Sequence, residues 1–160
     1  MIIRPYHQED AEEISSLVRR NLLEVNIRDY PAEDMEQMAA GYDGDKIRGV
    51  ADSGHLYVAL DQGKIIGSGA ITPLDGSEAE SLLQTVFILP EYQGQGVGRA
   101  LLQALEADHY FLRARRVVAN ASITARPFYE KMGYAYPSGR PVLIDNDYYE
   151  MEKLKAEGQA

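Results

Sequence analysis

Three glycines stand at alternate positions in the segment Pro90–Arg99, and this spacing suits a loop that binds phosphate. The run before it, Leu82–Ile88, is rich in β-branched and aromatic residues and is typical of a buried strand. Glycine has no Cβ atom, so the amides near Gly94, Gly96 and Gly98 can approach a ligand closely. After this segment, apolar residues recur at helical spacing and predict a helix. The partial positive charge at the N-terminus of a helix favours anions. The segment therefore predicts a pyrophosphate site.

Other phosphate-binding loops fit this segment poorly. A dinucleotide-binding loop requires G-x-G-x-x-G and an acidic residue about twenty positions later. Counted from Gly94, the sixth position is Arg99, and the region Val117–Ala119 carries no acid. A mononucleotide P-loop requires Gly-Lys followed by Ser or Thr, whereas Gly98 precedes Arg99 and Ala100. An ordinary strand-to-helix turn that needs glycine is the remaining alternative.

A second segment makes the interpretation specific. Gln93-x-x-Gly96-x-Gly98 resembles the acetyl-CoA loop of the GNAT superfamily of N-acetyltransferases. About twenty-five residues later, Ser122–Tyr134 resembles the second cofactor segment of that family, Asn-x-x-Ala-x-x-Phe-Tyr-Glu-Lys-x-Gly-Phe. Ser122 departs from this pattern, because asparagine is commoner there. The order, separation and character of the two motifs agree with the family, and the resemblance covers residues 1–154.

The resemblance implies a fold and a co-substrate. The fold is α/β, with layers of helices on both faces of a central, mixed, twisted sheet of about seven strands that splays between the fourth and fifth strands. Acetyl-CoA is the implied co-substrate, with its pantetheine arm along the fourth strand. The cofactor-binding residues that the resemblance implies are Val86, Phe87, Ile88, Gln93, Gly94, Gln95, Gly96, Val97, Gly98, Arg99, Ser122 and Tyr129. For Val86, Phe87 and Ile88 a purely structural role in the core is the alternative, and for Ser122 it is a plain helix cap.

Tyr129 is the candidate general acid. The family pattern places a tyrosine there, with its hydroxyl near the cofactor sulfur, and a phenol can donate a proton to a departing thiolate. Phe128, its neighbour, points elsewhere on a helix and is assigned to packing. The chain has eleven tyrosines, so an ordinary core tyrosine is the alternative.

Glu80 is the candidate general base. A lysine-like amine has a pKa of about 10.4, so only about one molecule in a few thousand is neutral at pH 7. A carboxylate, acting directly or through water, would help to remove the proton. Glu80 precedes the central strand, and Glu78 lies two residues earlier on the same face. The alternative is that both acids belong to a solvated loop.

Local patterns predict the elements that position these residues. Asp10 is a candidate N-cap for the first helix, and residues 41–49 are expected to be a loop. Pro127 is tolerated only near the start of a helix, which places the start of the last helix at about Ile123. The expected strands are 2–4, 55–60, 64–71, 82–88, 116–121, 134–136 and 148–153, and the expected helices are 10–26, 32–40, about 97–111 and 123–132.

Composition limits the class of protein. The 160 residues predict one domain, 1–154, followed by a polar tail, 155–160. There is no cysteine, and the three histidines lie far apart, so we expect no disulfide and no metal. No apolar run has the length of a membrane span and the N-terminus has no signal-peptide pattern, so a cytoplasmic protein is expected. The formal charge of −9 disfavours nucleic acid and is compatible with a cationic amine, although many soluble proteins are acidic.

Acceptor specificity is expected from three segments, 22–38, 42–50 and 139–148, which are rich in acids and tyrosines. Such a lining could hold a cation by charge and cation–π contact, and it is also what a solvated surface looks like. A polyamine, an aminoglycoside-like molecule, an amino acid and a protein N-terminus all stay open as acceptors.

These observations predict an N-acetyltransferase that moves an acetyl group from acetyl-CoA directly to a primary amine of a small molecule or peptide, in a ternary complex. Without cysteine or a Ser-His pair, no covalent enzyme intermediate is expected. One alternative is a non-catalytic acyl-CoA-binding or sensing domain of the same fold. A second is a nucleotide-binding module that uses the glycine loop for ATP or NAD. Members of the resembling family are often dimers, but no stripe in this sequence identifies an interface, so a homodimer stays open.

Overall fold

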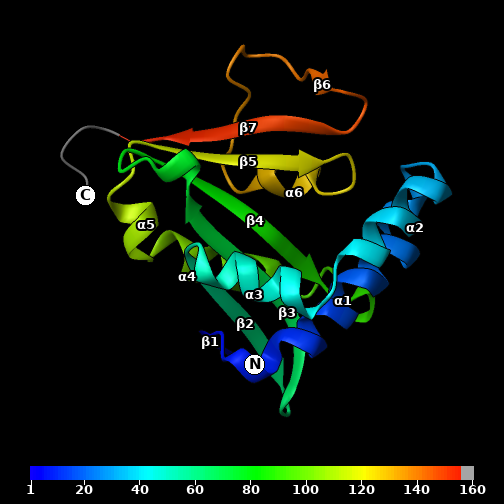
Figure 1. The fold of residues 1–160 in the computed structure, drawn as a ribbon. Coiled ribbons are helices and arrows are strands. Elements are labelled where there is room, and N and C mark those ends of the chain that lie inside the picture. Colours follow the sequence, from blue (N-terminus) through cyan, green and yellow to red (C-terminus); the bar gives the residue numbers. More distant parts are fainter. Residues whose placement is uncertain (156–160) are drawn as a thin grey trace.

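The computed structural model describes residues 1–155 (Figure 1). The strands are β1 (Ile2–Pro5), β2 (His55–Asp61), β3 (Lys64–Pro73), β4 (Glu80–Ile88), β5 (Arg116–Ser122), β6 (Leu143–Ile144) and β7 (Tyr148–Leu154). The α-helices are α1 (Ala11–Glu24), α2 (Ala32–Gly41), α3 (Gly44–Asp52), α4 (Val97–Glu106), α5 (His109–Leu112) and α6 (Arg126–Lys131), and four short 3-10 turns lie between them.

One mixed sheet organises the fold. Its strand order is β1-β2-β3-β4-β5-β7-β6, and all neighbours are antiparallel except β4 and β5, which are parallel. Helices α1 and α3 cover one face, with α2 packed on α1, and α4 to α6 cover the other face (Figure 1). The predicted α/β architecture, with about seven strands and helices on both faces, is confirmed.

The core follows the amphipathic pattern of the helices. Ile14, Val18 and Leu22 recur at helical spacing on α1 and are fully or almost fully buried against α2, α3 and the sheet. Leu101 and Leu105 do the same on α4, on the opposite face. Each such side chain contributes about 1.5–3 kcal/mol on burial, so the two helices are fixed firmly on the sheet that carries the site.

Residues 41–49, predicted as a loop, contain most of a helix instead. Asp43 caps α3 by accepting a hydrogen bond of 2.9 Å from the backbone N–H of Lys46, and Ile47 is completely buried. Asp43 is an N-cap residue that indicates the start of a helix. The glycines on either side of it favoured a loop in the prediction. Asp10, in turn, occupies the N-cap position of α1 but does not cap it with its side chain. Its carboxylate binds Arg4 at 2.8 Å and accepts from the N–H of His7.

Several other boundaries differ from the predictions. The helix predicted to reach Phe111 breaks after Glu106, because Asp108 caps the separate helix α5. The last helix starts at Arg126 rather than Ile123. The strand predicted at 134–136 is a single bridge from Ala135 to Glu152, and the short strand β6 was not predicted.

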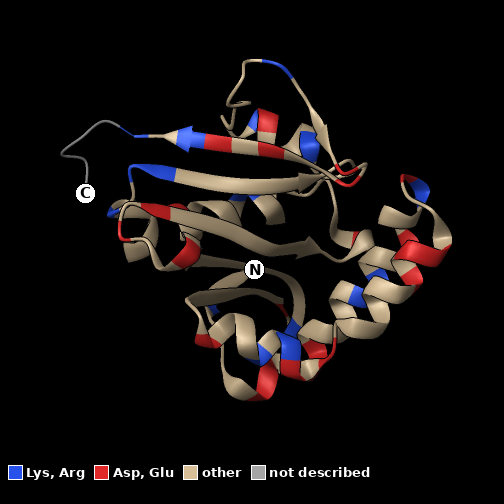
Figure 2. Ribbon diagram, turned by 45° about the horizontal axis from the view of Figure 1, so that its top comes forward, with Lys and Arg blue, Asp and Glu red and all other residues tan. Residues whose placement is uncertain are grey.

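The end of the described chain lies close to the predicted domain boundary. Strand β7 ends at Leu154, and of the predicted tail only Lys155 is among the described residues. Within residues 1–155, no helix combines the length and the apolar character needed to cross a membrane. Basic and acidic residues alternate along several elements, including β7 (Figure 2).

Candidate active site

The glycine-rich loop ends at the N-terminus of α4. Gly94 and Gly96 have φ values of 76° and 85°, in the left-handed region that glycine adopts without strain. A Cβ atom at Gly98 would lie 3.0 Å from a ring atom of Phe128, so glycine lets α4 approach α6 closely. Among residues 1–155, no side chain caps the N-terminus of α4. The first backbone N–H groups of this helix are therefore free to bind an anion.

Side chains hold this loop against α1. The Gln93 amide donates to Asn21 Oδ1 at 3.1 Å and to the Ile88 carbonyl at 3.2 Å. Arg20 pairs with Glu91 at 3.0 Å. These contacts fix the position of the loop, so the free amides at the start of α4 are preorganised.

Strands β4 and β5 part beside this loop. They pair from Glu80 opposite Arg116 as far as Leu83 opposite Ala119, and the later part of each strand has no partner in the other. The edge of β4 that faces the gap therefore carries backbone groups without a strand partner, as an extended ligand requires. The predicted splay between the fourth and fifth strands is confirmed.

A β-bulge in β4 accompanies this separation. Ser68 pairs with Phe87 and Ala70 with Gln84, so β4 has one more residue than β3 between these pairs. Thr85, in the bulge, has a φ of 55°, which is strained for a β-branched residue. Its carbonyl accepts from the Ser68 hydroxyl at 2.8 Å, and its own hydroxyl lies 3.0 Å from the Tyr42 hydroxyl. These bonds hold the strained backbone and turn β4 away from β5.

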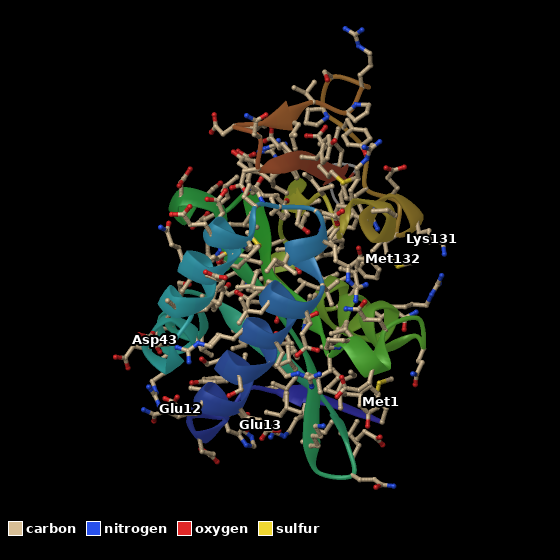
Figure 3. The ribbon with its side chains drawn as sticks, turned by 90° about the vertical axis from the view of Figure 1, so that its right-hand side faces the viewer. Met1, Glu12, Glu13, Asp43, Lys131 and Met132 are labelled. Atoms are coloured by element: carbon tan, nitrogen blue, oxygen red, sulfur yellow. The ribbon has the colours of Figure 1, made fainter. Side chains whose placement is uncertain are left out.

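A cavity of about 420 Å³, here called the cofactor cavity, joins the strand gap to the glycine loop. Two basic residues, Arg99 and Lys131, and no acidic residue are among the described residues that line it. Figure 3 shows Lys131 and Met132 at the end of α6, apart from Glu12 and Glu13 in the first turn of α1 and from Asp43 at the start of α3. The remaining lining residues are Asn21, Val25, Asn26, Val86, Phe87, Ile88, Tyr92, Gln93, Gly94, Gly96, Gly98, Ser122, Thr124, Ala125, Phe128, Tyr129 and Met132.

A smaller cavity of about 250 Å³, here called the acceptor cavity, adjoins the cofactor cavity at Tyr129. The two cavities share six lining residues, Asn26, Val86, Phe87, Ser122, Ala125 and Tyr129. The residues that line only the acceptor cavity are Leu22, Tyr30, Met35, Met38, Leu83, Gln84, Thr85, Asn120, Asp147 and Tyr148. A ligand in one cavity can therefore meet a ligand in the other at the shared residues.

Tyr129 lies in α6 at this junction, with 5% of its surface exposed. Its ring packs edge-on against Phe128 and Tyr134, with centroid separations of 5.3 and 5.6 Å. Burial raises the pKa of the Tyr129 phenol above its ordinary value. The phenol therefore keeps its proton at physiological pH, as a proton donor must.

Tyr30 closes one side of the acceptor cavity. Its hydroxyl accepts from the backbone N–H of Ile123 at 2.8 Å and donates to the carbonyl of Asp147. Next to it, the hydroxyl of Thr124 donates to Asp29 at 2.7 Å. Burial raises the pKa of Tyr30. These bonds connect the segment after α1 to the β5–α6 turn and to the β6–β7 turn.

The structure brings most of the predicted site residues to one place. Ten of the twelve predicted cofactor-binding residues line the cofactor cavity, and the exceptions are Gln95 and Val97. Gln95 is exposed and donates to the Glu91 carbonyl, while Val97 is buried in the core. Ser122 accepts a hydrogen bond of 3.0 Å from the Ala125 N–H, so it caps the turn before α6 as well as lining both cavities.

Glu80 is not brought to either cavity. It lies at the other end of β4, about 20 Å from Val86 at the usual rise of an extended strand. Its carboxylate accepts from Arg116 at 2.8 Å, and Arg116 also binds Glu150 and Glu152. Glu80 is therefore part of an ion-pair cluster between neighbouring strands.

Two segments expected to determine specificity reach the acceptor cavity. Met35 and Met38 come from the first of them, and Asp147 and Tyr148 from the last. The middle segment, 42–50, does not line it, because α3 packs on the core. Asn26, which lies within the first of these segments and lines both cavities, was not named individually as a site residue. No sequence motif surrounds it, and only the fold brings it to the site.

Comparisons with known proteins agree with this geometry. Residues 52–136, just over half of the chain, match the family model of the acetyltransferase (GNAT) domain. The uncharacterized N-acetyltransferase YesJ of Bacillus subtilis (strain 168) is 25% identical over 146 residues, which are 82% of this chain and 80% of that protein.

Two solved structures are similar over almost the whole chain. A GCN5-related N-acetyltransferase from Rhodopseudomonas palustris has a TM-score of 0.78 at 25% identity, covering 96% of this chain and 95% of that one. The PaiA N-acetyltransferase from Thermoplasma acidophilum, solved in complex with coenzyme A, also has a TM-score of 0.78, at 19% identity, with coverage of 96% and 98%. At 19% identity, the similarity to the PaiA N-acetyltransferase shows a shared fold and nothing further.

Proposed function

Because this chain belongs to the GNAT acetyltransferase family, we propose that it transfers an acetyl group from acetyl-CoA to a primary amine of a small molecule or peptide. The observation that carries the proposal is the cofactor cavity, which connects an unpaired strand edge to the uncapped N-terminus of α4. The relative solved with coenzyme A has the same fold and supports this choice of co-substrate.

The cofactor cavity suits the parts of acetyl-CoA. The amides of the glycine loop and of the first turn of α4 would bind the pyrophosphate, with Arg99 and Lys131 at the rim contributing positive charge. The backbone of Val86, Phe87 and Ile88 would hydrogen-bond the amides of the pantetheine arm, as one strand binds another. Ser122 would bind the same arm with its hydroxyl, which also caps the turn before α6.

The acceptor would reach the reaction centre from the acceptor cavity. Acetyl-CoA supplies a reactive thioester. A backbone N–H at the edge of β4 would stabilise the negative charge that develops on the carbonyl oxygen, because the strained bulge at Thr85 holds this edge away from β5. Tyr129 would donate its proton to the departing sulfur. The chain has no cysteine, so direct transfer within a ternary complex is the simplest route.

The amine must lose a proton before it attacks. Glu80 lies outside both cavities and is paired with Arg116, so we assign this step to water in the acceptor cavity rather than to that carboxylate. The rate is then limited at neutral pH by the small fraction of neutral amine.

A thermal melt with acetyl-CoA, CoA, ATP and NAD tests the proposal, followed by thiol release with a panel of amines. A ligand at about 100 times its dissociation constant stabilises the fold by about 2.7 kcal/mol, which for a domain of this size is a shift of about 5–10 °C. We expect this shift with acetyl-CoA and CoA only. No shift with either would contradict the proposal, and a shift with ATP or NAD would favour a nucleotide-binding module. A CoA shift without thiol release for any amine would indicate a non-catalytic acyl-CoA-binding domain.

A further inference from the structure

The charge of the acceptor cavity selects among amines. Among the described residues that line this cavity there is no lysine, arginine or histidine, and Asp147 is the one acidic residue. A carboxylate or phosphate on an acceptor would lose water on entry and gain no cationic partner. The lining therefore opposes acceptors that carry a negative charge.

The fold holds Asp147 firmly at this place. Asp145 and Asn146 both have φ values of 54°, and the N–H of Asp147 donates to the Ile144 carbonyl at 2.9 Å. These residues form a β-turn with two left-handed residues in the connection from β6 to β7, whose last paired residues are Ile144 and Tyr148. The Tyr30 hydroxyl donates to the carbonyl of Asp147 and ties the turn to the segment before α2.

The carboxylate of Asp147 is available to a ligand. It takes part in none of the ion pairs formed within residues 1–155. It lines the part of the acceptor cavity that is not shared with the cofactor cavity. A group bound to Asp147 is thus separate from the amine that reacts beside Tyr129.

Most residues that line only the acceptor cavity are apolar or aromatic, and Gln84, Thr85, Asn120 and Asp147 are the polar or charged ones. Leu22, Met35, Met38 and Leu83 present aliphatic or thioether surface, and Tyr30, like Tyr148, adds an aromatic ring. Methylene groups would pack on the first set, and an ammonium group near Asp147 would also be attracted to aromatic faces.

We infer that the acceptor is an aliphatic diamine or related dication, which places one amine beside Tyr129 and a second, positively charged group on Asp147. This inference rests on the proposed acetyltransferase function and names the substrate class of the same site. The apolar walls take the stem between the two nitrogens, and the lack of basic lining residues rejects amino acids and phosphorylated amines.

Thiol release with three acceptors of equal stem tests this. Pentane-1,5-diamine, pentylamine and 6-aminohexanoate share a stem of five carbon atoms and differ at its far end, which carries an ammonium group, only a hydrogen atom, or a carboxylate. The same comparison is repeated with stems of three to six methylenes. We expect kcat/KM to fall in the order diamine, monoamine, amino acid, by about five- to tenfold at each step, because an exposed ion pair contributes little more than this.

Two variants of the hairpin turn make the test specific to Asp147. In Asp147→Asn, the ratio of kcat/KM for the diamine to that for the monoamine should fall about five- to tenfold, mainly through KM. Asp145→Asn changes the net charge by the same amount in the same turn, but Asp145 does not line the cavity. This control should leave the ratio of kcat/KM for the diamine to that for the monoamine unchanged.

Three outcomes in which thiol is released would overturn the inference. These are a diamine no better than the monoamine at every stem length, an equal loss for all three acceptors in Asp147→Asn, and an amino acid as the best acceptor. Thiol release with none of the acceptors would overturn it too. The acetyl-CoA melt, which does not involve Asp147, then decides separately whether the proposed function fails.

Discussion

The two cavities of this protein meet at Tyr129 but have opposite charge. Within the described residues, the cofactor cavity is lined by Arg99 and Lys131 and by no acid, whereas the acceptor cavity is lined by Asp147 and by no base. Both use the same stretch of β4, so the difference comes from the elements on either side. The start of α4 and the end of α6 suit an anion, and the segment around α2 with the β6–β7 turn suits a cation. This difference in charge would favour an anionic substrate in one cavity and a cationic substrate in the other.

Among the variants that test this difference between the two cavities, Gly96→Val should have the largest effect. It should weaken binding in the cofactor cavity only. Gly96 has a φ of 85° with open space around it, so a β-branched side chain acts through the backbone and displaces the phosphate-binding amides. We expect Gly96→Val to weaken acetyl-CoA binding about 100-fold, or about 3 kcal/mol, in titration calorimetry.

The β2–β3 turn offers a matched control for this variant. Gly63 has a φ of 80° and equally open surroundings, but lies away from both cavities. Gly63→Val should cost similar stability and leave acetyl-CoA affinity within about twofold. Equal loss of affinity in both variants would mean that the glycine loop does not bind the co-substrate.

Removing the hydroxyl at the junction should separate chemistry from binding. Tyr129→Phe keeps the packing on Phe128 and Tyr134 but removes the proton donor. Turnover in the thiol-release assay should fall about 100-fold, with a loss of about tenfold as the lower bound. The affinity for acetyl-CoA should change little. Tyr134→Phe is the control, since Tyr134 is also buried but its hydroxyl binds Glu106 outside the cavities. Unchanged turnover in Tyr129→Phe would refute the assignment.

The pH–rate profile should follow the pKa of the acceptor amine and not the pKa of the Tyr129 phenol. Below the amine pKa, kcat/KM should rise about tenfold per pH unit as the neutral amine increases. Burial raises the pKa of Tyr129 above its ordinary value of 10.0, so its acid form persists as pH increases. The profile measured from pH 6 to 9.5 should therefore rise without a descending limb. A descending limb centred below pH 9 that disappears in Tyr129→Phe would show a lowered pKa instead.

Arg99→Ala and Lys131→Ala should have the smallest effects. Both side chains are exposed at the rim, where ion pairs contribute at most about 1 kcal/mol. Each change should raise the KM for acetyl-CoA about two- to fivefold at low salt, and the difference should shrink as ionic strength rises. Salt-independent effects would show that these side chains act by packing rather than by charge.

The cofactor cavity was largely predictable because its residues are close together in the sequence. The glycine loop and the segment after Ser122 each carry several site residues, and their types follow from backbone geometry at a helix N-terminus. Local contacts of this kind leave a pattern in the sequence. The side chains of Gln95 and Val97 lie outside the cavity lining, because neighbouring residues of one loop point to different surroundings.

The acceptor cavity was predictable only as a set of segments. Asn26 and Asp147 are more than a hundred residues apart, and neither lies in a motif. They share a cavity because α1 ends beside the splay, and because the β6–β7 turn is tied to Tyr30. Glu80 is the opposite case, a residue that the fold keeps away from both cavities. Its place before the central strand had suggested a catalytic base. The fold puts it at the far end of that strand, paired with Arg116.

A crystal structure with bound acetyl-CoA would test the central claim most directly. The account predicts the pyrophosphate on the amides between Gly94 and Arg99, the pantetheine arm along Val86–Ile88, and the sulfur beside the Tyr129 hydroxyl, with the acceptor cavity left open. Acetyl-CoA in the acceptor cavity, or a sulfur away from Tyr129, would contradict it.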